Sequence, residues 1–167
     1  MTTVIRNFSV NDIGALTEIY NWYVSKTTIT FDLEPYTVQQ RQARWMSHYS
    51  TTGRYRLLVA EIDGQVVGYT SSSQLRVKAA YDPSVESSIY LSHHVHRLGI
   101  GSLLYEKLFE QLKSEDVHRI YAGVTLPNEA SLAFHRQFGF VEVGRFHEVG
   151  RKFDQYWDVA WLEKSMP

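Results

Sequence analysis

The sequence contains no cysteine, and this absence excludes several kinds of chemistry at once. Disulfide bridges, thiol nucleophiles and cysteine-ligated metal centres are all ruled out, and a reducing compartment is consistent with the composition. Apolar runs long enough for a membrane span or a secretory leader are also missing, so we expect a cytoplasmic protein with no membrane partner. The formal net charge is only −1. No global basic field is therefore available for nucleic-acid binding.

The chain does contain enough apolar material for one buried core. Its 167 residues are 44% hydrophobic, which predicts a single domain over residues 1–167. Hydrophobic periodicity and turn residues predict elements in the order βααβββαβαββ. The expected strands are 2–8, 56–62, 65–73, 85–91, 117–124, 141–148 and 153–163, with helices after Ser9, from Val38 to about Tyr49, over 101–114 and after Asn128. This order predicts an α/β (α+β) fold, with a mixed central β-sheet and helices on both faces.

The most informative stretch runs from Val85 to Ser102, where an apolar strand leads through a polar corner into a glycine-rich turn and a helix. Glycines at 99 and 101 allow the backbone to approach a bulky anion, and the helix N-terminus adds partial positive charge. A pyrophosphate fits such a turn, although Gly-x-Gly before a helix is equally typical of a simple tight connection. Leu104 occupies the place of a third glycine and no Gly-Lys-Ser/Thr follows, which excludes the dinucleotide fingerprint and the P-loop.

This turn resembles the acetyl-CoA motif of the GNAT N-acetyltransferases, with His96 where that family usually has Gln or Arg. Nearly the whole chain is similar to the phosphinothricin and methionine sulfoximine acetyltransferase branch of the family. The segments that carry this resemblance are Ala80-Tyr81-Asp82, Val85-Glu86-Ser87, Ile89-Tyr90-Leu91, Leu126-Pro127-Asn128 and Val149-Gly150-x-Lys152-Phe153. The resemblance implies the GNAT fold, acetyl-CoA as co-substrate and a small amine as acceptor. It also implies a homodimer.

The resemblance assigns the cofactor contacts residue by residue. The backbone from Arg97 to Ser102 would hold the pyrophosphate, and Asn128 would hold the pantetheine arm. The full set of implied cofactor-binding residues is Ile89, Tyr90, Leu91, Arg97, Leu98, Gly99, Ile100, Gly101, Ser102 and Asn128.

Amide formation requires a base, because only an unprotonated amine attacks a thioester. Glu86 is the candidate: it lies in an apolar strand, where burial raises a carboxyl pKa, and the resembling family has a glutamate in the same setting. Pairing with Arg76 or Lys78 for structural reasons is the alternative. A backbone N–H at Leu91 is the candidate oxyanion donor, provided that a bulge or a splay frees it from the ladder.

A histidine stands where many GNAT enzymes have a tyrosine, at the end of Asn128-Glu129-Ala130-Ser131-Leu132-Ala133-Phe134-His135. A pKa of about 6.5 would let His135 either protonate the leaving sulfur or help to deprotonate the amine. A lone histidine on a helix is more often structural, so a positioning role also stays open.

The acceptor pocket is predicted mainly from the resemblance. Phe31 lies in a connection expected to be exposed, Thr27 to Pro35, which covers the acceptor site in the family, although an aromatic there is more often a simple plug. Arg76, Lys78 and Tyr81 would clamp a carboxylate or phosphinate, and Val159 would complete the pocket. Solvated charges in an ordinary loop are the alternative for the first three.

His93, His94 and His96 suggest a metal site only superficially. No cysteine or carboxylate completes a ligand set, and neighbouring side chains diverge, so we expect no metal. His96 in place of the usual residue is expected to weaken coenzyme A binding slightly above neutral pH; an unchanged dissociation constant in His96→Gln from pH 6 to 8 would disprove this.

Together these features predict transfer of an acetyl group from acetyl-CoA to the α-amine of a small anionic amino-acid analogue, by direct attack in a ternary complex. One alternative is another acceptor, such as an ordinary amino acid, a polyamine or a protein N-terminus, although basic pocket residues would repel a polycation. The other alternative is a GNAT-like domain that binds acetyl-CoA without turnover.

Overall fold

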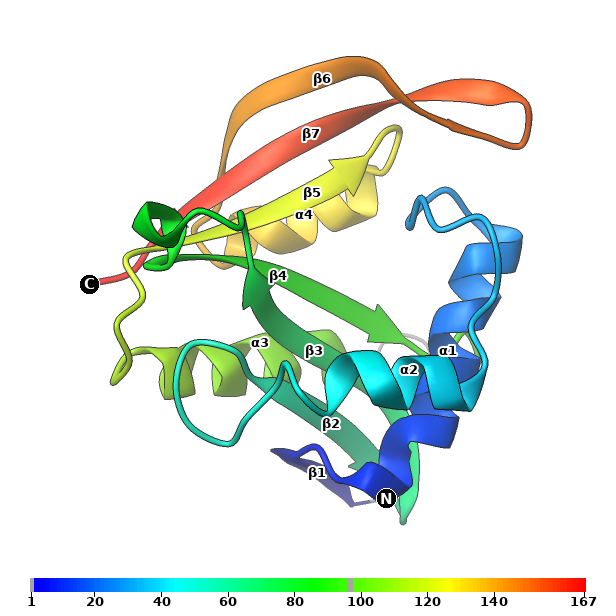
Figure 1. Cartoon of the computed structure of the whole chain (residues 1–167), viewed down its shortest axis with the longest axis vertical. Coiled ribbons are helices and arrows are strands. Elements are labelled where there is room, and N and C mark those ends of the chain that lie inside the picture. The colour runs from blue at the N-terminus through cyan, green and yellow to red at the C-terminus, as the bar shows by residue number, and fades with distance from the viewer. Residues whose placement is uncertain (1, 96–97) are drawn as a thin grey trace.

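The computed structural model describes residues 2–95 and 98–167, and its strands form one sheet (Figure 1). The strand order is β1-β2-β3-β4-β5-β7-β6. Their bounds are β1 (Thr3–Asn7), β2 (Leu57–Ile62), β3 (Gln65–Gln74), β4 (Ser84–Leu91), β5 (Arg119–Thr125), β6 (Val141–Lys152) and β7 (Gln155–Ser165). Adjacent strands are antiparallel except β4 and β5, which are parallel. The predicted mixed sheet is confirmed.

Helices cover both faces of this sheet, as predicted. They are α1 (Ile13–Lys26), α2 (Val38–Trp45), α3 (Ile100–Leu112) and α4 (Glu129–Gln137), with short 3-10 turns at Val10–Asp12 and Ala79–Tyr81. Alternation along β2 divides the core into two layers. Leu57 and Val59 pack with residues of α1 and α2, whereas Leu58 and Ala60 pack with residues of α3 and α4.

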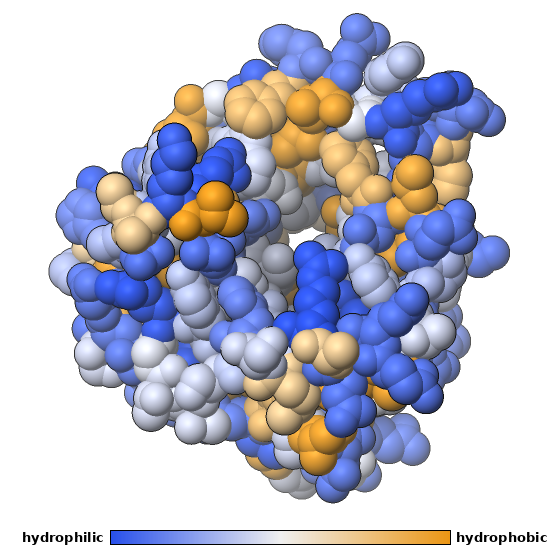
Figure 2. All heavy atoms as spheres, viewed as in Figure 1, coloured by the Kyte–Doolittle hydropathy of each residue, from blue (hydrophilic) through white to orange (hydrophobic). Residues whose placement is uncertain are grey.

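The parallel pair separates soon after it forms, and this separation positions the site. Only Ser84, Val85 and Glu86 of β4 pair with β5, opposite Arg119, Ile120 and Tyr121. The rest of β4 stays paired with β3 as far as Leu91. β4 and β5 therefore form a V that opens toward the C-terminal end of β4 (Figure 1). Figure 2 shows the same face hollowed near its centre.

Two predicted boundaries are corrected by the structure. α2 ends at Trp45 rather than near Tyr49: a turn follows in which the N–H groups of His48 and Tyr49 share the Trp45 carbonyl, and the Tyr49 hydroxyl bonds Ser73. The last hairpin is longer than expected: β6 reaches Lys152, and Phe153 and Asp154 form its two-residue turn with φ of 53° and 58°. Positive φ at two non-glycine residues gave no recognisable turn pattern in the sequence.

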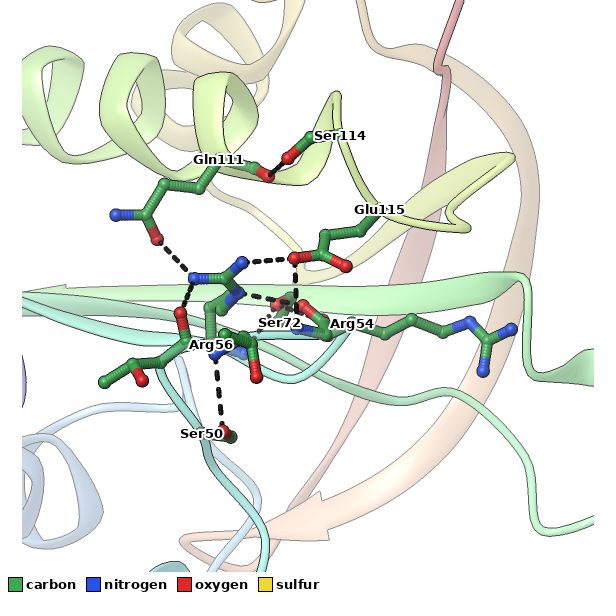
Figure 3. Close-up of polar contacts among 10 residues, drawn as sticks. Ser50, Arg54, Arg56, Ser72, Gln111, Ser114 and Glu115 are labelled. Carbon is green, nitrogen blue, oxygen red and sulfur yellow. Dashed lines mark hydrogen bonds and ion pairs between the residues drawn. The ribbon is translucent and has the colours of Figure 1, made fainter.

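The end of α3 is tied to the loop before β2 by a buried arginine (Figure 3). The Arg56 guanidinium donates to Glu115, to Gln111 and to the backbone carbonyls of Thr51 and Gly53. Glu115 also accepts from the Gly53 N–H. Because α3 begins at the glycine turn, this network fixes the far end of the helix that carries the candidate cofactor site.

Candidate active site

A cavity of about 280 Å³ lies where β4 leaves β5. Its wall combines residues that are far apart in sequence, from the segment after α1, from β4 and β5, and from α3, α4 and β7. Six predicted site residues line it: Phe31, Glu86, Ile89, Tyr90, His135 and Val159. The fold therefore gathers the predicted base, the predicted histidine and two predicted pocket residues around one space.

Glu86 lies on the face of β4 that packs toward α1 and α2, opposite Ser73 of β3. Burial raises the pKa of its carboxyl above the usual 4.5, and the positive charge of Arg76 opposes that rise. No ion pair to Glu86 occurs among the described residues. A partly desolvated carboxylate beside a cavity is suited to accept a proton near neutral pH.

The backbone N–H of Leu91 points into the V. The Ser92 N–H donates to the Val67 carbonyl at 2.7 Å, so Leu91 occupies the alternate, outward-facing position of the antiparallel ladder. β5 does not pair with β4 at this level, which means that the predicted splay exists. The Leu91 carbonyl accepts from the Tyr23 hydroxyl at 2.7 Å, which fixes this end of the strand.

His135 is buried, and its two ring nitrogens have different partners. Nδ1 lies 2.8 Å from the Ser131 carbonyl, an acceptor, so Nδ1 carries the proton. Nε2 lies 3.0 Å from the Tyr105 hydroxyl and accepts a hydrogen bond from it. Burial lowers the pKa of His135 below 6.5, and the bond to Ser131 opposes this change. The imidazole is therefore neutral at neutral pH.

The glycine turn forms the predicted helix N-terminus. Gly99 has a φ of +70° and precedes Ile100, the first residue of α3. Leu91, Leu98, Gly99, Ile100, Gly101 and Ser102 line a second hollow, of about 190 Å³, with Val95 and Phe134. Gly101 faces the Phe134 ring of α4, where an added Cβ would lie 3.4 Å from the ring.

Asn128 caps α4, as predicted: its side-chain oxygen accepts from the Ser131 N–H at 3.1 Å. The cap occupies the oxygen and leaves the side-chain amide hydrogens to reach a ligand. Arg97, the remaining predicted cofactor residue, and His96 lie outside the described residues.

The segment Thr27 to Pro35 was expected to be an exposed connection, and this holds for Ile29 and for residues 33–35 but not around Phe31. Thr30 is buried, and its carbonyl accepts from the buried Lys152 Nζ at 2.8 Å. The Phe31 ring packs on Gly150, where a Cβ would overlap it. The β6–β7 hairpin thus holds the segment against the sheet, because β6 extends four residues beyond its expected end.

Three predicted substrate residues lie away from these walls. Arg76, Lys78 and Tyr81 are exposed in the loop before β4, and none of them lines the cavity beside Glu86. Arg76 is nevertheless near enough to act electrostatically on Glu86.

Metal ligands are not assembled in the described part of the chain, where no group of three or more histidine or acidic residues is placed to hold an ion. The His93 ring instead stacks on Trp22, with centroids 4.5 Å apart. Among the described residues no helix is both long and apolar enough to cross a membrane.

Sequence reasoning missed two residues at the cavities. Tyr105 lies on the buried face of α3, and its contact with His135 cannot be predicted from spacing along the chain. Arg41 was not considered. A signal was present, because α2 (VQQRQARW) contains no acidic residue to pair with it.

A sheet that splays beside a helix N-terminus, with a buried carboxyl where the V begins, is the arrangement expected of an acyl-transfer enzyme that binds a phosphate-linked acyl donor. Residues 5–161 match the model of the acetyltransferase (GNAT) domain. The chain therefore belongs to the GNAT family, is an N-acetyltransferase and uses acetyl-CoA as its co-substrate.

Named relatives agree with this family. The chain is 49% identical over 157 residues to a phosphinothricin N-acetyltransferase of Streptomyces coelicolor, covering 93% of this chain and 91% of the relative. It is 29% identical to an L-methionine sulfoximine/L-methionine sulfone acetyltransferase of Pseudomonas paraeruginosa, covering 99% and 96%. A crystal structure of a phosphinothricin acetyltransferase from Sinorhizobium meliloti in complex with acetyl-CoA superposes with a TM-score of 0.92, at 29% identity, over 99% of this chain and 89% of that one.

The residues of this chain fit acetyl-CoA. The left-handed backbone at Gly99 and the start of α3 offer N–H groups to a pyrophosphate, and the open edge of β4 beyond Glu86 offers backbone groups to the amides of a pantetheine arm. When bound, acetyl-CoA supplies the activated acetyl group.

Proposed function

We propose that the acceptor is the α-amine of a small anionic amino-acid analogue of the phosphinothricin, methionine sulfoximine or methionine sulfone type, and that the amine attacks directly in a ternary complex. The names of the relatives support this acceptor class. The observation that carries the proposal is the position of Glu86, which lines a cavity at the point where β4 leaves β5 and has a raised pKa. A cavity of about 280 Å³ suits a small acceptor and excludes a folded protein domain.

Glu86 takes the proton from the incoming ammonium group, directly or through one water molecule. Its raised pKa brings the carboxylate closer to the pKa of the amine and so favours the transfer. The Leu91 N–H, which faces the V, donates to the acyl oxygen as negative charge develops there. Both groups are carried by one continuous strand, so their spacing is fixed by the ladder with β3.

His135 and Tyr105 relay the second proton. The Tyr105 hydroxyl donates a hydrogen bond to Nε2 of the neutral imidazole, so the Tyr105 oxygen takes a proton from the acceptor nitrogen while its own proton passes to Nε2. The reverse transfer then delivers that proton to the departing thiolate. The tautomer assignment argues against His135 as a free acid, because Nδ1–H is used by Ser131. His135 then positions Tyr105, and Glu86 is the main base.

The remaining assignments complete the proposal. The turn from Arg97 to Ser102 and the Asn128 amide would hold acetyl-CoA, while Phe31 and Val159 would enclose the acceptor. Arg76, Lys78 and Tyr81 would reach an anionic acceptor at the rim. We further propose one domain over residues 1–167, a homodimer and a cytoplasmic location.

A turnover panel tests the acceptor. Free coenzyme A release is measured with phosphinothricin, methionine sulfoximine, methionine sulfone, ordinary amino acids, a polyamine and an N-terminal peptide. We expect the first three to have the highest kcat/KM. Higher kcat/KM for ordinary amino acids, or for the polyamine, would replace this proposal with the corresponding alternative.

A second experiment tests the mechanism. Initial rates measured while both substrates vary should give intersecting lines, as a ternary complex requires. Parallel lines would indicate an acetylated enzyme and contradict direct attack. His135→Ala should lower kcat with acetyl-CoA binding unchanged.

A further inference from the structure

Arg41 of α2 is a buried cation without an acidic partner. Its side chain is buried, with 4% of the residue exposed, and its guanidinium carbon lies 3.7 Å from the Trp45 ring centre and 4.1 Å from that of Tyr20. Nη2 donates to the Tyr69 hydroxyl at 3.3 Å, and Nε has no hydrogen-bond partner. No carboxylate forms an ion pair with Arg41 in the described part of the chain.

Such an arrangement is energetically incomplete. Contact with aromatic faces stabilises a cation by about 0.5–2 kcal/mol. Removal of a charged group from water costs several kcal/mol more, and proteins normally offset that cost with a paired, hydrogen-bonded anion. The buried guanidinium of Arg41 therefore has no paired anion among the described residues, and a bound ligand could supply one.

The space for that anion is a third cavity, of about 470 Å³, which Arg41 lines. Its wall includes the hydroxyl-bearing residues Ser71, Ser73 and Ser88, which can donate to an oxyanion. Asp32 also lies on the wall, where its carboxylate accepts from the Tyr20 hydroxyl. His48 adds no charge at neutral pH, because burial and the nearby Arg44 lower its pKa.

This third cavity adjoins the predicted base. Ser88 and Tyr90 line both this cavity and the one beside Glu86. Ser73, on its wall, is the register partner of Glu86 across the β3–β4 ladder. An acceptor whose amine reaches Glu86 can therefore direct its acidic end along β4 toward Arg41.

Two buried side-chain nitrogens without a hydrogen-bond partner lie along this route from Glu86 to Arg41. Among the side chains that the structure describes, only Arg41 Nε and Trp161 Nε1 are buried nitrogen or oxygen atoms without a hydrogen-bond partner. Arg41 lines the larger cavity and Trp161 the smaller one. Unsatisfied donors are rare in protein interiors, and both occur here at cavity walls.

We propose that Arg41 binds an acidic group of the acceptor and so selects anionic amines. This inference rests on the proposed function and adds to it a specificity-determining residue distinct from the exposed Arg76 and Lys78. Contact with the Tyr20 and Trp45 rings restrains the planar guanidinium, which suits bidentate contact with a carboxylate or phosphinate.

The test compares Arg41→Gln with the wild type on three acceptors: phosphinothricin, methionine sulfone and methionine sulfone carboxamide. Loss of a buried charged contact predicts a rise in KM of about 30-fold or more for the two acids, with the carboxamide changed less than about threefold. A rise for phosphinothricin alone would identify the phosphinate as the bound group and still support the proposal. An equal change for all three acceptors, or no change, would overturn it.

Controls separate recognition from folding and from general charge. Arg145→Gln removes an exposed arginine of β6 that pairs with Glu142 and lines neither cavity, and should have a much smaller effect. If Arg41→Gln does not fold, Arg41→Lys keeps the charge without the planar fork and should raise KM only for the acids. Calorimetric titration of methionine sulfone into the coenzyme A complex of each protein measures binding without turnover. Equal affinities of wild type and Arg41→Gln for methionine sulfone would refute the role of Arg41. If the wild type binds the acids more tightly than Arg41→Gln but acetylates none of them, only the proposed function is refuted.

Discussion

The Tyr105 hydroxyl lies 3.0 Å from Nε2 of His135, and both side chains are buried beside the cavity that contains Glu86. Ser87 Oγ lies 3.2 Å from the same hydroxyl, so Tyr105 has a partner on either side. Burial raises the pKa of Tyr105, and the hydroxyl stays protonated. A histidine that sequence alone places on a helix is thus one half of a hydrogen-bonded pair that joins α3 to α4.

Tyr105→Phe should separate positioning from structure. Loss of the hydroxyl removes the donor to Nε2, and that donor stabilises the neutral imidazole, so we expect the pKa of His135 to rise. We expect kcat to fall about 10-fold or more, with acetyl-CoA binding unchanged. NMR titration of His135 and steady-state kinetics provide the measurements.

Tyr121→Phe is the matched control, because the Tyr121 hydroxyl bonds Glu163 and lies outside the cavity. It should leave kcat and the His135 titration unchanged. If Tyr105→Phe also leaves both unchanged, the pair has no role in proton transfer.

Glu86→Gln should lower kcat by about 100-fold or more, the range expected for loss of a general base. The same change should stabilise the protein at neutral pH. Burial raises the pKa of Glu86 in the folded state, so the folded protein binds this proton more tightly than the unfolded chain does. Above the raised pKa the Glu86 carboxylate is charged and buried, and this lowers the free energy of unfolding. The gain should therefore be largest at pH 8 and shrink as the pH falls through the raised pKa. Thermal melting at pH 8 and pH 5 checks this, and a gain that grows toward low pH would contradict the assignment.

Gly150→Ala should disturb the acceptor cavity from a distance. A Cβ at this position overlaps the Phe31 ring, so the ring must move, at a cost of about 1–3 kcal/mol. We expect a lower melting temperature and a raised KM for the amine, because Phe31 lines the cavity. Gly144→Ala, in the same strand with nothing within 4 Å of the added carbon, should change neither. Equal effects of the two substitutions would show that strand propensity, and not contact with Phe31, is responsible.

Glu115→Gln should destabilise the protein in a pH-dependent way. The Gly53 N–H and the Arg56 guanidinium lower the pKa of Glu115, so its contribution to stability is present above pH 4.5 and is lost as the pH falls through the lowered pKa. The melting temperatures of wild type and variant should therefore converge at low pH. Glu110→Gln removes an exposed pair with Lys107 and should have little effect. A constant difference between wild type and Glu115→Gln down to pH 2 would exclude the charge as its cause.

The sequence by itself determined the order of elements, the glycine turn, the cap at Asn128 and the resemblance to an acetyl-CoA-dependent family. These features are local. They are the spacing of apolar residues, every 2 residues in strands and every 3.6 in helices, a cap that bonds the N–H three residues later, and glycines where the backbone turns. They were readable because the residues concerned are neighbours in the chain. The ends of α2 and β6 could not be predicted in this way. The end of β6 depends on a turn with positive φ at Phe153 and Asp154, which the surrounding hairpin imposes. The residues after α2 are held by the contact of Tyr49 with Ser73, which is distant in sequence.

Only the tertiary structure decided what surrounds the base. The V at Glu86 exists because β4 follows β3 while β5 turns away to pair with β7, and no single strand contains that information. The same packing joins Tyr105 to His135, lays Lys152 against Thr30 and leaves Arg41 buried without an acid. Contacts between residues 30 to 122 positions apart are set by how the layers meet, whereas spacing along the chain only shows which faces are apolar.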